Sequence, residues 1–235
     1  MRTGIVIRYG PRHFTGWARS KCEPCFADRA EWRRPEPPHE FTHMSVIIDR
    51  ALGYRRTSRT SVNESSLDST DQKMMAHCLE LARAATQAGE FPFAAVISKN
   101  GEIIAETINQ VAHDADITRH AELIAVSAGQ KVLGRGNLKN CTLYTIVEPC
   151  PMCSFAIREA RIGRVVFALS SPLMGGSSRW NVLGDDVLSS HMPEVFAPPP
   201  DIVAGMLSKE AANVWRRWNP IIWGIIRLRG VFRLF

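Results

Sequence analysis

Four side chains in the sequence have types and spacings that suit a bound metal ion. His120 and Glu122 stand two residues apart, and Cys150 and Cys153 form a Cys-x-x-Cys pair directly after Pro149. One imidazole and two thiolates are ligands that zinc prefers, and three protein ligands leave the fourth tetrahedral position open. An open position is typical of hydrolytic zinc sites, where the metal lowers the pKa of a bound water toward neutrality. We therefore predict a zinc site formed by His120, Cys150 and Cys153.

Glu122 is not needed as a ligand, and its position predicts a separate role. It follows His120 by two residues, so both side chains lie in one turn if the segment is helical. A carboxyl group beside the open metal position can take a proton from the bound water and return it to a leaving group. We predict that Glu122 is the catalytic acid and base of the site.

Each part of this pattern is weak evidence by itself, because single histidines and isolated Cys-x-x-Cys pairs often have no special role. The combination is specific, since it also requires a Glu two residues after His120 and a Pro before Cys150. One alternative stays open. The same residues would suit a zinc-stabilised interaction module that keeps its ligands for folding.

The elements that position these residues begin with an amphipathic helix, predicted from residue 71 to Gly89. Its apolar residues recur at helical spacing and are Met74, Met75, Cys78, Leu81, Ala82 and Ala85. Residues 93–98 and 102–108 are predicted strands, and Asn100-Gly101 between them is typical of tight hairpins. An antiparallel pair is therefore expected after the helix.

The first metal ligand falls at the start of a further helix. Thr118 is predicted to cap a helix over residues 119–129, because it precedes a run with apolar residues at helical spacing. This helix places His120 and Glu122 in its first turn.

The two cysteines fall at the start of the next helix, predicted from Pro149 to about residue 161. They share one face near its N-terminus, where the helix dipole favours thiolate. Residues 142–147 and 164–169 are predicted strands on either side of this helix. Strand, helix and strand in this order form the right-handed crossover of a parallel pair, so the whole sheet is expected to be mixed.

The remaining sequence adds loops and closing elements. Residues 174–181 and 197–201 are rich in Gly, Ser or Pro and predict loops, followed by a short strand at 202–204 and a helix at 209–218. Residues 221–226 are mostly apolar but too few to span a bilayer. They suit a packing segment, an oligomer contact or a membrane-surface segment.

The length of 235 residues fits one domain with extensions. The first part, residues 1–70, is rich in Arg, Ser, Thr and Pro without periodicity, which predicts a disordered or loosely docked extension. We expect the domain at 71–219 and an apolar, basic C-terminal tail at 220–235. Six cysteines in this length do not indicate a disulfide framework, and no apolar run predicts a transmembrane span. A cytoplasmic location is therefore expected.

The net charge of +6 is carried by the two ends of the sequence. Residues 1–70 carry +4, residues 71–219 carry −1 and residues 220–235 carry +3. A domain close to neutral lacks the strong positive field expected of a protein that grips a phosphate backbone. Arg158, Arg161 and Arg164 could still form a local basic stripe.

The His-x-Glu and Pro-Cys-x-x-Cys motifs resemble those of the zinc-dependent cytidine/deoxycytidylate deaminase superfamily. The resemblance covers about residues 71–219 and is strongest to the branch of tRNA adenosine deaminases, guanine deaminases and cytosine deaminases. It implies a three-layer α/β fold with a five-stranded mixed sheet between helices, zinc as the cofactor, and a homodimer.

The resemblance also implies residues that contact a substrate. Asn109 stands eleven residues before His120, where the family has an Asn that binds the substrate. The backbone around Ala121 and Pro149 is expected to position the ring. Residues 92–96 resemble the first-strand motif of the family, with Ala94 where Gly is common.

The substrate class follows less directly from the sequence. Residues 172–178 depart from the loop of the tRNA enzymes, and the expected domain is nearly neutral. We therefore expect a hydrolytic deaminase that converts the exocyclic amine of a nucleobase or nucleoside to a carbonyl and releases ammonia. A tRNA adenosine-to-inosine deaminase is the first alternative, and the non-catalytic zinc module is the second.

Overall fold

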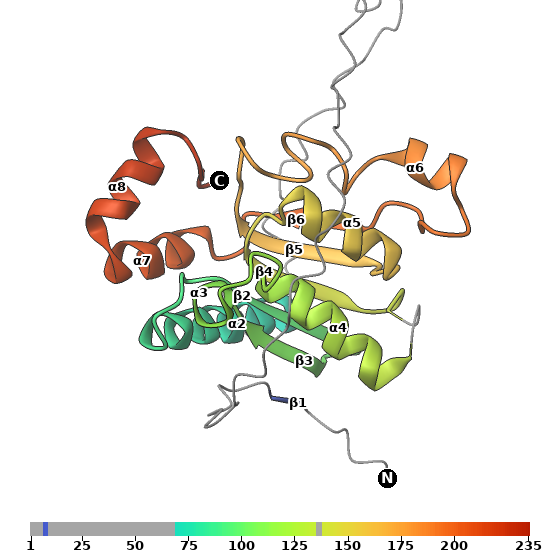
Figure 1. Ribbon diagram of the computed structural model, residues 1–235, viewed down its shortest axis with the longest axis horizontal. Helices are drawn as coiled ribbons and strands as arrows, with labels where there is room; N and C mark the ends of the chain where they lie inside the picture. The colour runs from blue at the N-terminus through green and yellow to red at the C-terminus, as the bar shows by residue number, and fades with distance from the viewer. Residues whose placement is uncertain (1–6, 9–68, 135–137) are drawn as a thin grey trace, which may run out of the picture. The chain divides into compact units, whose positions relative to one another are not determined.

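A mixed β-sheet lies at the centre of the structure, a computed structural model that describes residues 7–8, 69–134 and 138–235 (Figure 1). Its strand order is β1-β3-β2-β4-β5-β6. The strands are β1 (Ile7–Arg8), β2 (Ala94–Lys99), β3 (Glu102–Ile108), β4 (Thr142–Val147), β5 (Arg164–Leu169) and β6 (Asp201–Ala204). The helices are α2 (Ser69–Gln87), α3 (Val111–Asp114), α4 (Ala121–Leu133), α5 (Pro151–Glu159), α6 (Asp186–His191), α7 (Ser208–Trp218) and α8 (Pro220–Leu228).

The five longer strands form the mixed sheet that the sequence predicts. β2 runs antiparallel to both β3 and β4, whereas β4, β5 and β6 run parallel to one another. The two-residue strand β1 adds a parallel pairing to the outer side of β3. The predicted α/β fold is confirmed, and β1 extends the sheet by one short strand. The extension predicted for residues 1–70 lies outside the described residues apart from positions 7, 8, 69 and 70.

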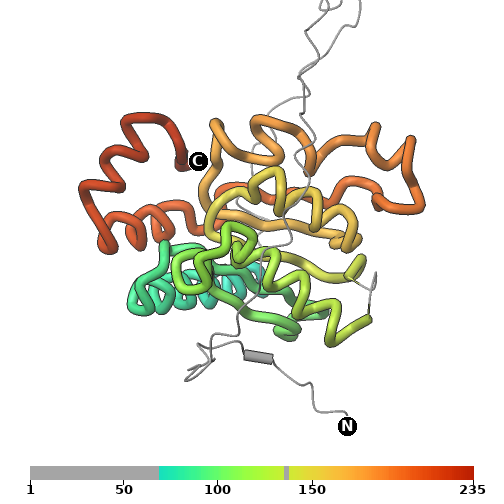
Figure 2. Tube along the Cα trace, viewed as in Figure 1, coloured from blue at the N-terminus to red at the C-terminus, as the bar shows by residue number. Residues whose placement is uncertain are grey.

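Alternating side chains divide the core into two layers, one on each face of the sheet. Ala94 and Val96 of β2 pack with apolar residues of α2 and α7, while Ala95 and Ile97 pack with those of α4 and α5. The alternation follows from the two-residue period of a strand. Helix α7 joins α2 on the first face, as the trace in Figure 2 shows in red and teal. The result is the three-layer arrangement of helices, sheet and helices.

The predicted hairpin between β2 and β3 forms at Asn100-Gly101. Both residues have positive φ angles, 53° for Asn100 and 79° for Gly101. This combination is typical of a type I′ turn, whose twist matches that of the flanking strands. The turn sets the pairing next to it, and an irregularity between Ile97 and Ser98 then shifts the register by one residue. Beyond this shift the end of β3, and Asn109 after it, lie alongside the start of β2.

The helices that carry the metal ligands begin slightly later than predicted. His120, rather than Thr118, is the N-cap of α4. The Thr118 amide and hydroxyl both donate to Asp116, so this side chain closes a local turn instead of capping the helix. Cys150 is the N-cap of α5, and Pro151 occupies the first helical position, where its missing N–H costs nothing.

Three short helices escape the sequence-based prediction: α3, α6 and α8. The first two have four and six residues, too few to show a helical period. Helix α8 falls within the tail predicted at residues 220–235, and the Asn219 side chain caps it by accepting from two backbone amides. None of the helices in the described ranges is both long and apolar enough to cross a membrane.

A buried ion pair fastens α2 to the sheet. Asp71 accepts hydrogen bonds of 2.6 and 2.7 Å from the Arg164 guanidinium and one of 2.7 Å from the Tyr144 hydroxyl. Burial alone would raise the pKa of Asp71, but these hydrogen bonds outweigh it and hold the pKa below its ordinary value of 3.8. The pair therefore stabilises the fold as long as Asp71 is ionised.

We expect Asp71→Asn to lower the free energy of unfolding by about 3 kcal/mol, because it leaves Arg164 without its buried partner. The ionised Asp71 contributes fully above the unfolded-state pKa, and its contribution is lost as the pH falls through the lowered folded-state pKa. The difference between wild type and variant should therefore persist at pH 7 and shrink below about pH 4. Urea denaturation at several pH values would measure it.

Asp201→Asn is the matched control for this prediction. Asp201 binds the same Arg164 at 3.1 Å, but its side chain is 70% exposed. Exposed ion pairs contribute little, so this variant should lose less than about 1 kcal/mol. Equal losses in the two variants would contradict the role assigned to Asp71.

Candidate metal centre

The three predicted metal ligands come together in the structure. Nδ1 of His120 lies 3.7 Å from Sγ of Cys150 and 3.5 Å from Sγ of Cys153, and the three ligand atoms all lie within 4.8 Å of one another. His120 and Cys150 are the N-caps of α4 and α5, so two helix N-termini meet at this cluster. Cys153 reaches it from the first turn of α5.

The donor set and its spacing fit zinc. Zinc binds thiolate at about 2.3 Å and imidazole at about 2.0 Å, so a tetrahedral ion separates the sulfur and nitrogen donors by about 3.6 Å. The two sulfur-to-nitrogen distances observed, 3.7 and 3.5 Å, bracket this value. Among the described residues, no fourth His, Cys, Asp or Glu joins the group. The cluster therefore suits a zinc ion with one position left for another ligand.

The two thiols differ in their proton affinity. Hydrogen bonds from Cys153 and then from His120 favour the Cys150 thiolate and outweigh its burial, which lowers its pKa to about 4. The pKa of Cys153 is raised, first by its hydrogen bond to Cys150 and then by burial. A divalent cation favours the thiolate at both positions, because it supplies positive charge where only one thiolate is otherwise stable.

Glu122 lies beside the cluster with its two carboxyl oxygens facing different groups. Oε1 accepts a hydrogen bond of 3.2 Å from the Thr145 hydroxyl, and Oε2 lies 3.7 Å from Sγ of Cys153. Burial is the main cause that raises the pKa of Glu122. One oxygen is thus held by the protein while the other is directed toward the metal ligands.

Ala121 and Pro149, the other predicted neighbours of a substrate, are tied down by their carbonyl groups. Ala121 accepts from the Thr107 hydroxyl at 2.7 Å, and Pro149 accepts from the Gly176 amide at 2.7 Å. Ala121 is the first residue of α4, where backbone N–H groups have no partner within the helix. Both residues are buried, and both carbonyl groups are engaged within the protein.

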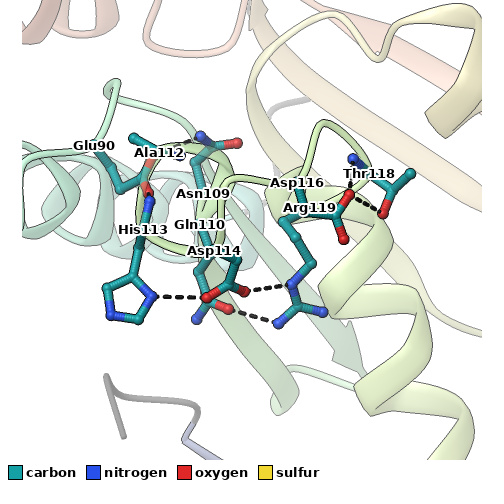
Figure 3. Close-up of polar contacts among 9 residues, drawn as sticks. All are labelled: Glu90, Asn109, Gln110, Ala112, His113, Asp114, Asp116, Thr118 and Arg119. Atoms are coloured by element: carbon teal, nitrogen blue, oxygen red, sulfur yellow. Dashed lines mark hydrogen bonds and ion pairs between the residues drawn. The ribbon is translucent and has the colours of Figure 1, made fainter. Parts of the chain in front are cut away.

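Asn109 is buried at the end of β3 and is held by a carboxylate that the sequence did not indicate. Its Nδ2 donates to Glu90 at 2.9 Å, and Glu90 also accepts from the amides of Ala112 and His113 (Figure 3). Because a carboxylate only accepts, the Asn109 amide nitrogen must face Glu90, and Figure 3 shows its oxygen turned away. Only the position of Glu90 before the predicted first strand could have drawn attention to it.

A second network holds the segment between Asn109 and His120. Arg119 donates to Asp114 at 2.8 Å and to the Gln110 side chain at 2.7 Å (Figure 3). The Gln110 amide donates to the Arg119 carbonyl at 3.0 Å. These contacts close the connection between β3 and α4 into a small loop, so that Asn109 and His120 keep a fixed separation.

Glu148 anchors the loop that follows β5 onto the segment that carries the cysteines. Its carboxylate is buried and accepts hydrogen bonds from the backbone or hydroxyl groups of Ser170, Ser171, Ser177 and Ser178. Two glycines allow this close approach. A Cβ on Gly175 would lie 2.3 Å from the Glu148 carboxyl carbon, and one on Gly176 would lie 2.0 Å from the Ser154 hydroxyl. Sequence reasoning missed Glu148, although it directly precedes Pro149.

The basic stripe suggested for α5 and β5 does not form. Arg158 is buried, and its guanidinium donates to the carbonyls of Val182, Leu183 and Ala197. Arg164 is engaged by Asp71. These arginines hold the fold together, which removes the local cationic face that the sequence left open.

We expect Glu148→Gln to loosen the loop over residues 170–178, because an amide nitrogen cannot accept from the N–H groups that face it. The free energy of unfolding should fall by about 2 kcal/mol, the range for hydrogen bonds to a charged group. Limited proteolysis should cut the variant faster within this loop than the wild type. Glu102→Gln, on the exposed start of β3, is the control, and a Glu148→Gln loop that resists protease like wild type would contradict the anchoring role.

The geometry agrees with comparisons to known proteins. The family model of the cytidine and deoxycytidylate deaminase zinc-binding region matches residues 68–169. The chain is 39% identical over 145 residues to the tRNA-specific adenosine deaminase of Haemophilus influenzae, a match that covers 61% of this chain and 79% of that protein. It spans only 12 to 25% of the length of three other curated relatives that it matches.

Solved structures show the same fold. One from a study of A-to-I editing by tRNA:A34 deaminases is 30% identical with a TM-score of 0.51, covering 60% of this chain and 98% of that one. A guanine deaminase from Nitrosomonas europaea is 25% identical with a TM-score of 0.52, covering 63% and 84%. The chain therefore belongs to the zinc-binding cytidine and deoxycytidylate deaminase superfamily, in the branch of the tRNA adenosine deaminases and guanine deaminases.

Proposed function

We propose that the chain is a zinc-dependent hydrolytic deaminase that converts an exocyclic amine of a nucleobase or nucleoside to a carbonyl and releases ammonia. The observation that carries this proposal is the position of the Glu122 carboxyl, which lies 3.7 Å from Cys153 beside a group that has three metal ligands within the described part of the chain. A zinc ion held for folding alone is normally enclosed by four protein ligands and needs no buried carboxyl beside it.

The residues of the site divide the reaction between them. His120, Cys150 and Cys153 hold the zinc through one nitrogen and two sulfur atoms. Zinc, when bound, lowers the pKa of a water molecule so that it can attack near neutral pH. Glu122 takes the proton released by the attacking water and passes it to the ring nitrogen. It then takes a second proton from the hydroxyl group newly formed on carbon and delivers it to the amine, which leaves as ammonia when the carbon–nitrogen bond breaks and the carbonyl forms. The Thr145 hydroxyl keeps the other carboxyl oxygen in place during these transfers.

Asn109 serves as the substrate contact in this proposal. Glu90 fixes its side chain from behind, so its amide oxygen meets the ring without first having to change rotamer. The Ala121 N–H and the Pro149 ring complete the residues that position the base. The tight loops around Asn109 and Pro149 support this assignment, because a base must be held in one orientation for a proton to move along a defined path.

A free base or nucleoside is the substrate class that we favour. The arginines of α5 and β5 are engaged within the protein, and residues 71–219 carry a net charge of −1. A tRNA substrate is the second candidate, which the 39% identity to a tRNA-specific adenosine deaminase favours. We place the deaminase domain at residues 71–219, between an N-terminal extension at 1–70 and the tail at 220–235.

We also propose a cytoplasmic homodimer. A cytoplasmic location suits a site that needs reduced thiols, and the four cysteines in the described residues are all free. Dimerisation is supported by the outer face of α5, where Met152 is 38% and Phe155 46% exposed beside the metal ligands. Met152 and Phe155 stand three residues apart on α5 and form the apolar contact in this proposal.

We expect Glu122→Gln to bind zinc like the wild type and to lose at least about a thousandfold in turnover, because the proton carrier is removed and the ligands are kept. Ammonia release would be measured with guanine, cytosine, adenine, their nucleosides and a tRNA pool. Cys150→Ser is the control for zinc binding: unlike Glu122→Gln, it should lose zinc as well as activity.

Each outcome of this assay separates the candidates. Unchanged turnover in Glu122→Gln would remove the mechanism. Ammonia release from tRNA alone would establish the second candidate, and stoichiometric zinc without release from any substrate would favour the interaction module.

For the dimer, we expect a Met152→Ser/Phe155→Ser double variant to sediment as a monomer while the wild type sediments as a dimer. The apolar contact that α5 offers is lost in the variant. Ile117→Ser is the control, because Ile117 is 77% exposed and lies outside α5. A double variant that remains dimeric would exclude α5 from the interface.

A further inference from the structure

Helix α8 has two apolar sides, and only one of them is used for packing. Trp223 and Ile226 pack against the core cluster on the α2 and α7 face. The Trp223 ring stacks on Trp215 with centroids 6.5 Å apart, and Asn219 caps the first turn. The helix is therefore fixed in its rotation about its own axis, and its opposite side cannot turn inward.

The opposite side is a stripe of exposed apolar residues. Ile221 is 75%, Ile225 48% and Leu228 88% exposed, and the exposed Gly224 lies between them. These positions follow the spacing i, i+3, i+4 and i+7, which places them on one face of a helix. A continuous apolar face of this kind indicates a partner rather than scattered surface residues.

Arginines border this stripe without any acidic residue among them. After Glu210 the sequence contains five arginines and no Asp or Glu. Three of the five, Arg227, Arg229 and Arg233, line a pocket of about 580 Å³ together with Leu228 of the stripe and Phe232. The apolar stripe thus runs directly into a cationic pocket.

We propose that α8 and the residues after it form a docking surface for a bilayer that contains anionic phospholipids. A helix on a membrane surface inserts its apolar face among the acyl chains while arginines at its borders bind lipid phosphates. The stripe runs along α8 from Ile221 to Leu228, and the pocket lined by the three arginines adjoins its C-terminal end at Leu228. This inference does not depend on the proposed deaminase activity.

Other occupants fit this surface less well. An RNA strand would satisfy the arginines but would leave the isoleucines and Leu228 against a polyanion. A second copy of the chain would cover the stripe but would bring arginines together with no acidic partner after Glu210. The anionic bilayer is the partner that accepts both the apolar and the cationic part.

Flotation of the full-length chain with vesicles tests the proposal. We expect binding to phosphatidylcholine vesicles with about one third phosphatidylglycerol, weak binding to phosphatidylcholine alone, and weaker binding at high salt. Both Ile221→Ser/Ile225→Ser/Leu228→Ser and Arg227→Gln/Arg229→Gln/Arg233→Gln should reduce binding at least about tenfold. Because the mutated side chains in the first variant are all exposed, circular dichroism should show an unchanged fold.

The matched controls change exposed residues elsewhere on the domain. Ile117→Ser removes an apolar residue, and Lys73→Gln/Arg83→Gln/Lys139→Gln removes three exposed cations. Both should bind like the wild type. The α8 variants keep the basic residues at 1–70, so a loss of binding in them cannot come from that segment. Equal binding by the two α8 variants and the wild type would overturn the proposal.

Two further results would also overturn it. One is binding to RNA that the arginine variant loses and the serine variant keeps, without binding to vesicles. The other is self-association that the serine variant abolishes, again without binding to vesicles.

Discussion

Two helix N-termini that meet at one place constrain the rest of the site. The N-cap position of a helix is usually filled by Ser, Thr, Asp or Asn, whose side chain accepts from the first backbone amides. Here the N-caps are His120 and Cys150, both in extended conformation, and neither side chain makes such a hydrogen bond. Each helix lacks the hydrogen bond of a capping side chain, which contributes about 1 kcal/mol, because its N-cap side chain turns toward the other helix instead. Pro151 partly compensates in α5, because it suits the first helical position.

Buried carboxylates fix the loops on two sides of this meeting point. Glu90 accepts hydrogen bonds from Asn109 and from the start of α3, and Glu148 accepts them from the loop after β5. A carboxylate that accepts several amide hydrogen bonds in a dry environment holds them more strongly than a neutral group would. The three glutamates near the metal ligands differ in the groups that they contact. Glu90 and Glu148 each accept several hydrogen bonds from loop groups, while Glu122 accepts one from Thr145 and directs its other oxygen toward Cys153.

The metal ligands were easier to predict from the sequence than the residues that hold the surrounding loops in place. His120, Cys150 and Cys153 could be assigned because metal ligands need particular residue types at short spacings. The predicted bounds of β3, β4 and β5 match the observed ones to the residue, because a tight-turn signal precedes β3 and strand-forming residues fill β4 and β5. Thr118 was wrongly expected to cap α4, because the competing turn with Asp116 depends on loop geometry.

The supporting residues could not be predicted, because their partners are distant in the chain. Glu148 binds residues 22 or more positions away, and Arg158 binds carbonyls 24 to 39 positions away. A single Glu or Arg in a sequence gives no sign of such contacts. The exposed face of α8 was equally hidden, since the pattern of residues 221–226 is apolar on both sides and only packing decides which side faces solvent.

The two glycines over Glu148 have a consequence for how such a protein can change over evolutionary time. Gly175 and Gly176 sit where any side chain would collide with Glu148 or Ser154, so the base of this loop tolerates almost no variation. Leu173 and Met174, just before them, are about half exposed and meet no such restriction. A lineage could therefore exchange Leu173 and Met174 while inheriting the base of the loop unchanged. The loop therefore combines two positions that cannot accept a side chain with two that can, within the four residues from Leu173 to Gly176.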